Sequence, residues 1–207
     1  MTYRFRYRRY AEALYDALQE DAFYLTMEKS VPGDGSKEAM VRYMDYSMAE
    51  AERYGELFVP ETHDYGVSVW SRPLGQKRQH EKQERKKTFL EDHMGQESVT
   101  TYEAIVDFMA ERSNALVKGD SWYLSIVGIQ PEFQGQGLGA GLVKAMLART
   151  DTLGVATYLE TFSSRNMSFY HRLGYRALEG IDEPTTGARY WLMSRAANSA
   201  PARLVRH

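Results

Sequence analysis

The 207-residue chain contains no cysteine. Disulfides, thiolate metal ligands and any mechanism that holds an acyl group on a protein thiol are therefore excluded. Long apolar runs are also missing, whereas a bilayer-spanning helix needs about 18 apolar residues in succession. The N-terminal residues are rich in arginine and lack the apolar centre of a signal peptide. We therefore expect a cytoplasmic protein that does not act at a membrane.

An excess of charge of one sign is missing as well. Lysine and arginine number 26 against 28 aspartate and glutamate residues, and the formal net charge is −2. Because nucleic-acid-binding domains are usually strongly basic, this balance predicts a small-molecule partner and no nucleic acid. His63, His80 and His93 do not stand at metal-ligand spacing with carboxylates, and we predict no metal.

The 43% apolar and 26% charged residues are typical of a globular domain. We predict a single domain over residues 1–195 and a flexible tail over 196–207. Residue periodicity predicts strands at 2–10, 57–59, 66–71, 121–129, 155–160 and 189–194. It predicts helices at 11–29, 37–54 and 138–150, and two helices within 75–118 that separate near Gly95 and Gln96. Strands and helices therefore alternate, as in the α/β class.

A basic run occupies the first half of the 75–118 stretch. Two glutamates oppose six cations in it, which are Lys77, Arg78, Lys82, Arg85, Lys86 and Lys87. One interpretation is a contact with a phosphate or an acidic partner. A solvated helix face with local ion pairs is the more usual explanation of such a run, and we favour it.

The most informative segment is IVGIQPEFQGQGLGAGL at 126–142. An apolar strand ends in it, a proline turn follows, and glycines alternate into the next helix. Gly135, Gly137 and Gly139 can adopt unusual backbone dihedrals and permit close approach. N–H groups of the turn and of the first helical turn can then converge on an anion, and phosphate oxygens match that geometry.

Three alternatives compete for these glycines. The nucleotide-binding P-loop is excluded because no Gly-Lys-Ser/Thr follows. A dinucleotide fingerprint can be fitted to Gly135, Gly137 and Ala140, with Glu160 as the ribose-binding acid, but too few residues follow for the larger sheet that this fold needs. The third alternative is a tight turn that serves only helix packing.

Two blocks of sequence carry a family resemblance. The run QGQGLG at 134–139, preceded by VGIQP at 127–131, resembles the Gln/Arg-x-x-Gly-x-Gly/Ala signature of the GNAT N-acetyltransferases. LET at 159–161, Asn166 and SFYHRLGY at 168–175 are similar to that family's following strand and its Asn-x-x-x-Tyr-x-x-x-Gly-Tyr/Phe helix. The match is looser over the first 120 residues.

The resemblance implies a mixed, twisted sheet with helices on both faces that splays between strands 121–129 and 155–160. The pantetheine arm of acetyl-CoA would lie in that gap, paired with backbone groups of Val127 and Ile129. Amides of 134–140 would hold the pyrophosphate, Asn166 would bind the pantetheine arm, and Tyr170 would face the sulfur. The residues expected to bind acetyl-CoA are Val127, Gly128, Ile129, Gln134, Gly135, Gln136, Gly137, Leu138, Gly139, Ala140, Asn166, Ser168 and Tyr170.

Acyl transfer to an amine requires a neutral nucleophile, a polarised carbonyl and a proton for the departing thiolate. A tyrosine can donate that proton, and Tyr170 is the candidate because of its place in the second block. The N–H of Ile129 is the candidate donor to the carbonyl oxygen. His171 follows Tyr170 directly and would point about 100° away from it on a helix.

Glu160 is the candidate general base, since it stands at the end of a strand that faces the gap and a partly desolvated carboxylate can accept a proton. The same carboxylate could instead bind a cationic acceptor or cap the turn before Ser163. Tyr123 and Ser125, on the opposing strand, are weaker alternatives for the base.

The sequence thus predicts an N-acetyltransferase that moves an acetyl group from acetyl-CoA to a primary amine of a small molecule or peptide. A CoA-binding module without turnover and a dinucleotide-dependent oxidoreductase stay open, as does a homodimer. Met40, Met44 and Met48 share a helix face and are expected in the core. The aromatic residues expected on the acceptor side are Tyr43, Tyr46, Tyr65 and Trp70.

Overall fold

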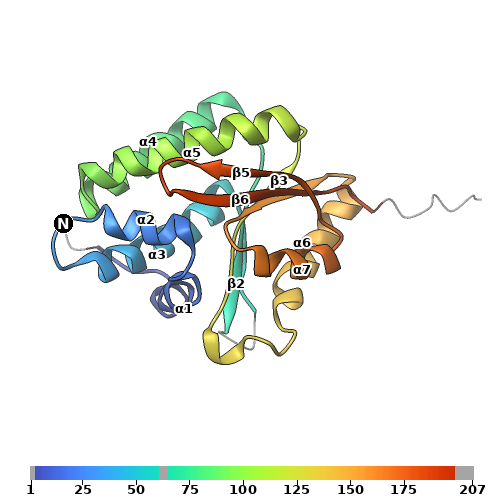
Figure 1. Cartoon of the computed structure of the whole chain (residues 1–207), viewed down its shortest axis with the longest axis horizontal. Coiled ribbons are helices and arrows are strands. Elements are labelled where there is room, and N and C mark those ends of the chain that lie inside the picture. Colours follow the sequence, from blue (N-terminus) through green and yellow to red (C-terminus); the bar gives the residue numbers. More distant parts are fainter. Residues whose placement is uncertain (1–2, 61–64, 199–207) are drawn as a thin grey trace, which may run out of the picture.

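The computed structural model describes residues 3–60 and 65–198. In these residues, strands form one sheet in the order β1-β2-β3-β4-β6-β5 (Figure 1). Neighbouring strands are antiparallel except β3 and β4, which run parallel. The mixed α/β sheet is therefore confirmed. The strands are β1 (Gly55–Phe58), β2 (Gly66–Ser71), β3 (Trp122–Ile129), β4 (Thr157–Thr161), β5 (Arg176–Glu183) and β6 (Ala188–Arg195).

Helices cover both faces of this sheet. On one face α1 and α3 pack against β2, and on the other α6 packs against β2 and β3 while α7 lies against β4. Helices α4 and α5 run side by side and contact α3 and α2 respectively (Figure 1). The helices are α1 (Arg8–Leu18), α2 (Ala22–Lys29), α3 (Ser36–Tyr54), α4 (Gln76–His93), α5 (Gln96–Leu116), α6 (Gly139–Leu153), α7 (Ser164–Arg172) and the short 3-10 helix η1 (Pro131–Phe133).

Strand β2 shows how two cores share one sheet. Val67 and Val69 belong to the core formed with α1, α3 and α4. Ser68 and Trp70 point to the opposite face, where the Ser68 hydroxyl donates to the Leu142 carbonyl of α6 at 2.6 Å. Because both faces are covered, nearly all residues of the strand are buried, and buried and exposed residues do not alternate.

The predicted N-terminal strand at 2–10 is wrong. Its alternation is real, because the side chains of Tyr3, Phe5 and Tyr7 are partly buried and those between them are exposed. The backbone, however, bonds to a side chain and not to a strand. The buried carboxylate of Asp45 on α3 accepts hydrogen bonds from the N–H groups of Arg6 and Tyr7 and from the Tyr3 hydroxyl. Residue 2 lies outside the described part of the chain.

The single helix predicted at 11–29 is two helices. Helix α1 ends at Leu18, and Asp21 caps the start of α2 by accepting the N–H of Phe23 at 3.0 Å. Aspartate favours this position over a helix interior because its carboxylate satisfies a free N–H group at the helix start. The cap also places Asp21 beside the site described below.

Strand β5 was missed because its sequence lacks the expected alternation. Arg176 to Gly180 are all exposed, and only Ile181 and Glu183 of this strand are buried. It forms the edge of the sheet and depends on its pairing with β6 for its conformation. The other predicted strands and helices agree with the structure to within a few residues.

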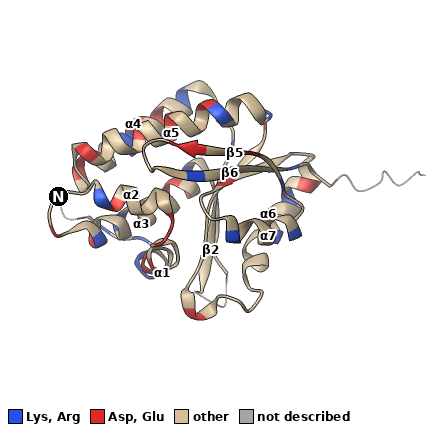
Figure 2. Cartoon of the chain, in the orientation of Figure 1, with Lys and Arg blue, Asp and Glu red and all other residues tan. Residues whose placement is uncertain are grey.

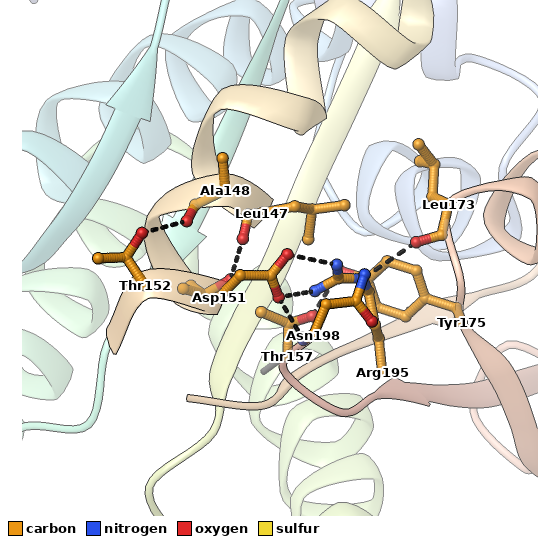
Figure 3. Close-up of polar contacts among 10 residues, drawn as sticks. Leu147, Ala148, Asp151, Thr152, Thr157, Leu173, Tyr175, Arg195 and Asn198 are labelled. Atoms are coloured by element: carbon orange, nitrogen blue, oxygen red, sulfur yellow. Dashed lines mark hydrogen bonds and ion pairs between the residues drawn. The ribbon is translucent and has the colours of Figure 1, made fainter. Parts of the chain in front are cut away.

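A polar cluster joins the end of β6 to the end of α6 (Figure 3). Arg195 on β6 forms an ion pair with Asp151 and donates from Nε to the Leu173 carbonyl at 3.0 Å. Of the predicted tail at 196–207, residues 199–207 lie outside the described residues, and the Asn198 N–H donates to Asp151 at 2.7 Å. Within the described ranges, no helix is long and apolar enough to cross a membrane.

Candidate active site

Strands β3 and β4 separate partway along their length. Their ladder runs from Trp122 opposite Thr157 to Leu124 opposite Leu159, and no later residue of β3 is paired with β4. Strand β3 nevertheless continues to Ile129, paired on its other side with β2. The splay that the sequence predicted between 121–129 and 155–160 is therefore present.

A β-bulge at Ser125 lies where the two strands part. Leu124 is opposite Trp70 and Ile126 is opposite Val69, so Ser125 has no partner residue on β2. Its hydroxyl donates instead to the Val69 carbonyl at 3.0 Å. A bulge places two residues of one strand against one of its neighbour, and it bends and twists the strand that carries it.

The bulge changes which backbone groups face the gap. The Trp122 N–H donates at 2.9 Å to the carbonyl of Ala156, the residue before β4. The Gln130 N–H instead donates at 2.8 Å to the carbonyl of Tyr65, the residue before β2. In a regular strand, N–H groups an even number of residues apart point the same way, so the extra residue has reversed the alternation. The N–H groups of Val127 and Ile129 therefore point into the gap.

The glycine loop follows directly from this strand. Gly135 and Gly137 have φ values of 75° and 77°, and no atom lies within 4 Å of the position that a Cβ would take on either. The Gln134 side chain donates to the Ile129 carbonyl at 2.9 Å, so the loop folds back on the strand end. Helix α6 then begins at Gly139 without a side-chain cap, which leaves N–H groups of its first turn available.

Two of the predicted cofactor-binding glycines have a packing role. A Cβ on Gly128 would lie 2.6 Å from Leu14, so the missing side chain allows α1 to approach β3. A Cβ on Gly139 would lie 3.1 Å from Phe169, where α6 meets α7. Ser168 is exposed, and its hydroxyl donates to the Arg165 carbonyl at 3.4 Å. None of the three lines the cavity described next.

One cavity of about 850 Å³ brings together Val127, Glu160, Asn166 and Tyr170. We call it the central cavity. It begins at the splay between β3 and β4 and extends under α2, α3, α4 and α5. Tyrosines from six elements line it, namely Tyr24, Tyr43, Tyr54, Tyr102, Tyr123, Tyr158 and Tyr170.

Tyr170 is buried at this cavity, with 6% of its surface exposed. Its ring packs against Phe169 at 5.1 Å and Tyr175 at 6.1 Å between centroids. Burial raises the pKa of its hydroxyl, and the neighbouring Tyr175 and Asp21 raise it further. The group therefore keeps its proton at neutral pH, as a proton donor must.

Glu160 lies near the end of β4 on the wall of the central cavity. Burial raises the pKa of this carboxyl to about 7, and a hydrogen bond with Tyr123 offsets part of the rise. Its Oε1 atom is buried without a hydrogen-bond partner among the described residues. A carboxyl with these properties can accept a proton near neutral pH.

The residues expected on the acceptor side divide into two groups. Tyr43 lines the central cavity and Tyr46 stacks on Phe89 at 4.2 Å beside it. Trp70 is fully buried on the opposite face of β2, and Tyr65 packs near Phe133 by the glycine loop. Trp70 and Tyr65 therefore do not line the central cavity. Met40, Met44 and Met48 are in the core, as predicted.

Sequence reasoning missed residues that reach the cavity from the N-terminal helices. Asp21 and Tyr24 enter from α2, Glu50 from α3 and Lys86 from α4. Burial raises the pKa of Asp21 to about 6. No motif marks these positions, and the capping pattern at Asp21 is the one signal that could have indicated its place.

The basic run on α4 mostly forms local ion pairs. Arg53 and Arg85 both contact Glu81, and Lys87 lies 3.9 Å from Glu103 on α5. Charges of both signs are spread along α4 and α5 (Figure 2). Arg85 and Lys87 thus have the local ion pairs that the solvated-face interpretation predicted. Lys82 is half-buried and Lys86 is buried, and both approach Glu50.

Comparison with known proteins adds a family match. Residues 97–177 match the model of the acetyltransferase (GNAT) domain, and this segment includes both sequence blocks. A solved structure from Corynebacterium glutamicum, described as histone acetyltransferase HPA2 and related acetyltransferase, is 21% identical. It covers 93% of this chain and 92% of that chain, with a TM-score of 0.60.

Two further solved structures are similar over nearly their whole length. Arylalkylamine N-acetyltransferase 2 from Aedes aegypti is 11% identical, covers 94% of this chain and 98% of that chain, and has a TM-score of 0.59. The Drosophila melanogaster polyamine N-acetyltransferase, which catalyses the formation of N-acetylagmatine, is 14% identical, with 93% and 98% coverage and a TM-score of 0.56. At these identities the likeness shows a shared fold.

Proposed function

We propose that this chain, whose residues 97–177 match the model of the acetyltransferase (GNAT) domain, transfers an acetyl group from acetyl-CoA to a primary amine. One observation carries this proposal. Val127 of the splayed strand, a protonated buried tyrosine and a carboxyl with a pKa near 7 line one cavity. These are the groups that direct acyl transfer to an amine requires.

The residues fit acetyl-CoA as the acyl donor. The N–H groups of Val127 and Ile129 face the gap without a strand partner. An extended pantetheine arm carries amide carbonyls that can accept hydrogen bonds from them, as a neighbouring strand would. The open space over Gly135 and Gly137 and the uncapped start of α6 suit a pyrophosphate. Asn166, on the cavity wall, is proposed to contact the pantetheine arm.

The bound thioester supplies the carbonyl carbon that the amine attacks. Glu160 accepts the proton that the amine nitrogen loses as the new C–N bond forms. The N–H of Ile129 donates to the carbonyl oxygen. Tyr170 donates its proton to the sulfur as the C–S bond breaks. Glu160 then releases its proton to water and Tyr170 takes one up from water, so no net proton is gained or lost by the protein. The reaction needs no covalent intermediate on the protein.

The fold neighbours support a small acceptor. The Aedes aegypti protein is an arylalkylamine N-acetyltransferase and the Drosophila melanogaster protein a polyamine N-acetyltransferase. Side chains of α2 to α5 line the central cavity, whose volume of about 850 Å³ has room for such a molecule. We therefore propose a small-molecule amine as the acceptor.

The melting temperature with acetyl-CoA, CoA and NAD tests the donor. A ligand present at 100 times its dissociation constant stabilises the folded state by about 2.7 kcal/mol. Stabilisation by acetyl-CoA and CoA is expected, and failure of both to stabilise the folded protein would exclude the transferase. Stabilisation by NAD alone would favour an oxidoreductase.

A tyrosine variant then tests turnover, measured as thiol release with a panel of amines. Tyr170→Phe should bind acetyl-CoA normally and lose turnover by about a hundredfold or more. Tyr15→Phe is the control, because Tyr15 packs against the N-terminal core outside the central cavity and should keep full activity. Binding of acetyl-CoA without turnover of any amine by the unmodified protein would identify a non-catalytic CoA-binding module.

A further inference from the structure

Lys86 is the buried cation of the central cavity. Only 6% of its surface is exposed, although it belongs to a helix whose other lysines and arginines reach solvent. Its ammonium nitrogen lies 4.8 Å from the ring centroid of Tyr43, 4.6 Å from that of Tyr46 and 5.9 Å from that of Tyr102. Three aromatic rings thus surround the charged group at one end of the cavity.

The hydrogen bonding of this ammonium group is incomplete. Its nearest polar atoms are the Ser47 hydroxyl at 3.5 Å and Oε2 of Glu50 at 3.6 Å. An ammonium group has three N–H donors, and a buried charge is costly unless it is paired and hydrogen-bonded. Burial lowers the pKa of Lys86, and Glu50 offsets part of the shift. A further acceptor at this point would stabilise the charged form.

Glu50 is shared between two lysines. The same Oε2 atom lies 3.7 Å from the Lys82 ammonium, and Lys82 has the Ser71 hydroxyl as its other partner at 3.2 Å. The two ammonium groups at this end of the cavity therefore share one oxygen of Glu50. A ligand carboxylate placed here would give both ammonium groups a further acceptor, whereas a ligand ammonium group could not.

Lys86 and the proposed reaction centre belong to different elements of the cavity wall, α4 on one side and β4 and α7 on the other. Tyr24, whose ring centroid is 6.4 Å from that of Tyr43, also interacts electrostatically with Tyr170. A series of neighbours, Tyr43, Tyr24 and Tyr170, thus leads from Lys86 to the proposed reaction centre. A ligand that reaches both ends needs a chain that packs against these rings.

We propose that Lys86 binds a carboxylate of the acceptor, so that the acceptor is an aminocarboxylate with several bonds between its amine and its carboxylate. The inference rests on the proposed function, because the amine must reach Glu160 while the carboxylate is at Lys86. An ω-amino acid or a short peptide has this arrangement. The tyrosines of the cavity pack against the chain that joins the two groups.

Three amines matched in chain length test this assignment, namely ε-aminocaproate, hexylamine and hexamethylenediamine. We expect the unmodified protein to acetylate ε-aminocaproate with the highest kcat/KM. Lys86→Met keeps an apolar stem of similar size and should lower that value by about tenfold or more, as expected for loss of a charged hydrogen bond. The value for hexylamine should change by less than about twofold. Lys77→Met, on an exposed part of α4 outside the cavity, should change neither.

Two results would overturn the assignment while leaving acetyl transfer intact. One is a preference for hexamethylenediamine over ε-aminocaproate, and the other is an equal loss of activity toward ε-aminocaproate and hexylamine in Lys86→Met. If none of the three amines is acetylated, the carboxylate site is tested by the melting temperatures of the unmodified protein and of Lys86→Met with CoA and caproate. A rise with the unmodified protein but not with Lys86→Met supports the carboxylate site, and no rise contradicts it. Failure of acetyl-CoA itself to stabilise the protein would instead count against the proposed function.

Discussion

Arg195 and Asp151 face each other through two contacts of 2.7 Å, one from each terminal nitrogen of the guanidinium group (Figure 3). The exposed fraction of the Arg195 side chain is 6% and that of Asp151 is 20%. The same guanidinium donates to the Leu173 carbonyl just after α7. One arginine therefore joins α6, α7 and β6, which carry or flank the two motif blocks.

Removing this arginine should destabilise the fold. Arg195→Met leaves the carboxylate of Asp151 unpaired, and we expect the free energy of unfolding to fall by about 2 to 4 kcal/mol in urea titrations. Arg189→Met is the control, because the Arg189 and Asp182 side chains are 55% and 77% exposed, and it should change stability by less than about 0.5 kcal/mol. Equal effects of the two substitutions would contradict the structural role of Arg195.

The contribution of the Arg195–Asp151 ion pair to the free energy of unfolding should depend on pH. Pairing lowers the pKa of Asp151 below its value in the unfolded chain. The stabilisation is therefore present at neutral pH and is lost as pH falls through the lowered pKa. Unfolding measured from pH 7 to pH 3 should show the difference between the unmodified protein and Arg195→Met shrinking with acid.

The pH dependence of turnover should report Glu160. With a pKa of about 7 in the free protein, its carboxyl is protonated in acid and unable to act as a base. We expect kcat/KM to fall below pH 7 and Glu160→Gln to remove this step, with a loss of about a hundredfold or more at pH 8. Glu179→Gln on the exposed edge strand should retain the full profile. An unchanged acid limb in Glu160→Gln would assign the base elsewhere.

The same substitution should stabilise the folded protein. The pKa of Glu160 rises from 4.5 to about 7 on folding, so the folded state binds the proton more tightly. Stability therefore falls as pH rises between these values, and a neutral glutamine avoids that loss. At pH 8 we expect Glu160→Gln to unfold with a free energy higher by on the order of 2 kcal/mol, and at pH 4 to match the unmodified protein. A variant less stable at both pH values would contradict the inferred cost of the buried carboxylate.

The glycine loop can be tested with two equivalent glycines. Gly137 and Gly187 have φ values of 77° and 65°, with no atom near the Cβ position of either. Alanine at each should cost about 1 kcal/mol of stability because both need a left-handed backbone. Only Gly137→Ala should weaken acetyl-CoA binding, measured by calorimetry. If the two variants bind acetyl-CoA with similar affinity, the glycine loop does not contribute to phosphate binding.

Much of the fold could be predicted because its elements have strong local patterns. The strand at 66–71 agrees with the structure at both ends, and the long polar stretch does divide into two helices at Gly95. Prediction failed where a tertiary contact replaced the local signal. Asp45 holds the N-terminal segment out of any sheet, and β5 is a strand only because β6 pairs with it.

The site was predictable on one side only. The second block placed Tyr170 and Asn166 on the cavity wall together with Glu160, because strand and helix signals fix their spacing. Lys86 could not be distinguished in the sequence from the five basic residues around it. Its burial depends on how α4 packs over α3 and α5, which no local pattern encodes.

The bulge at Ser125 determines on which side of β3 the N–H groups of Val127 and Ile129 lie. If Ser125 joined the regular ladder, alternation would continue from Trp122 and both amides would turn toward β2. Deletion of Ser125 would leave both amides facing the gap, because the residues on either side already alternate correctly without it. Relatives that lack this residue can thus keep the site, whereas a relative of equal length with a regular strand would have to relocate it.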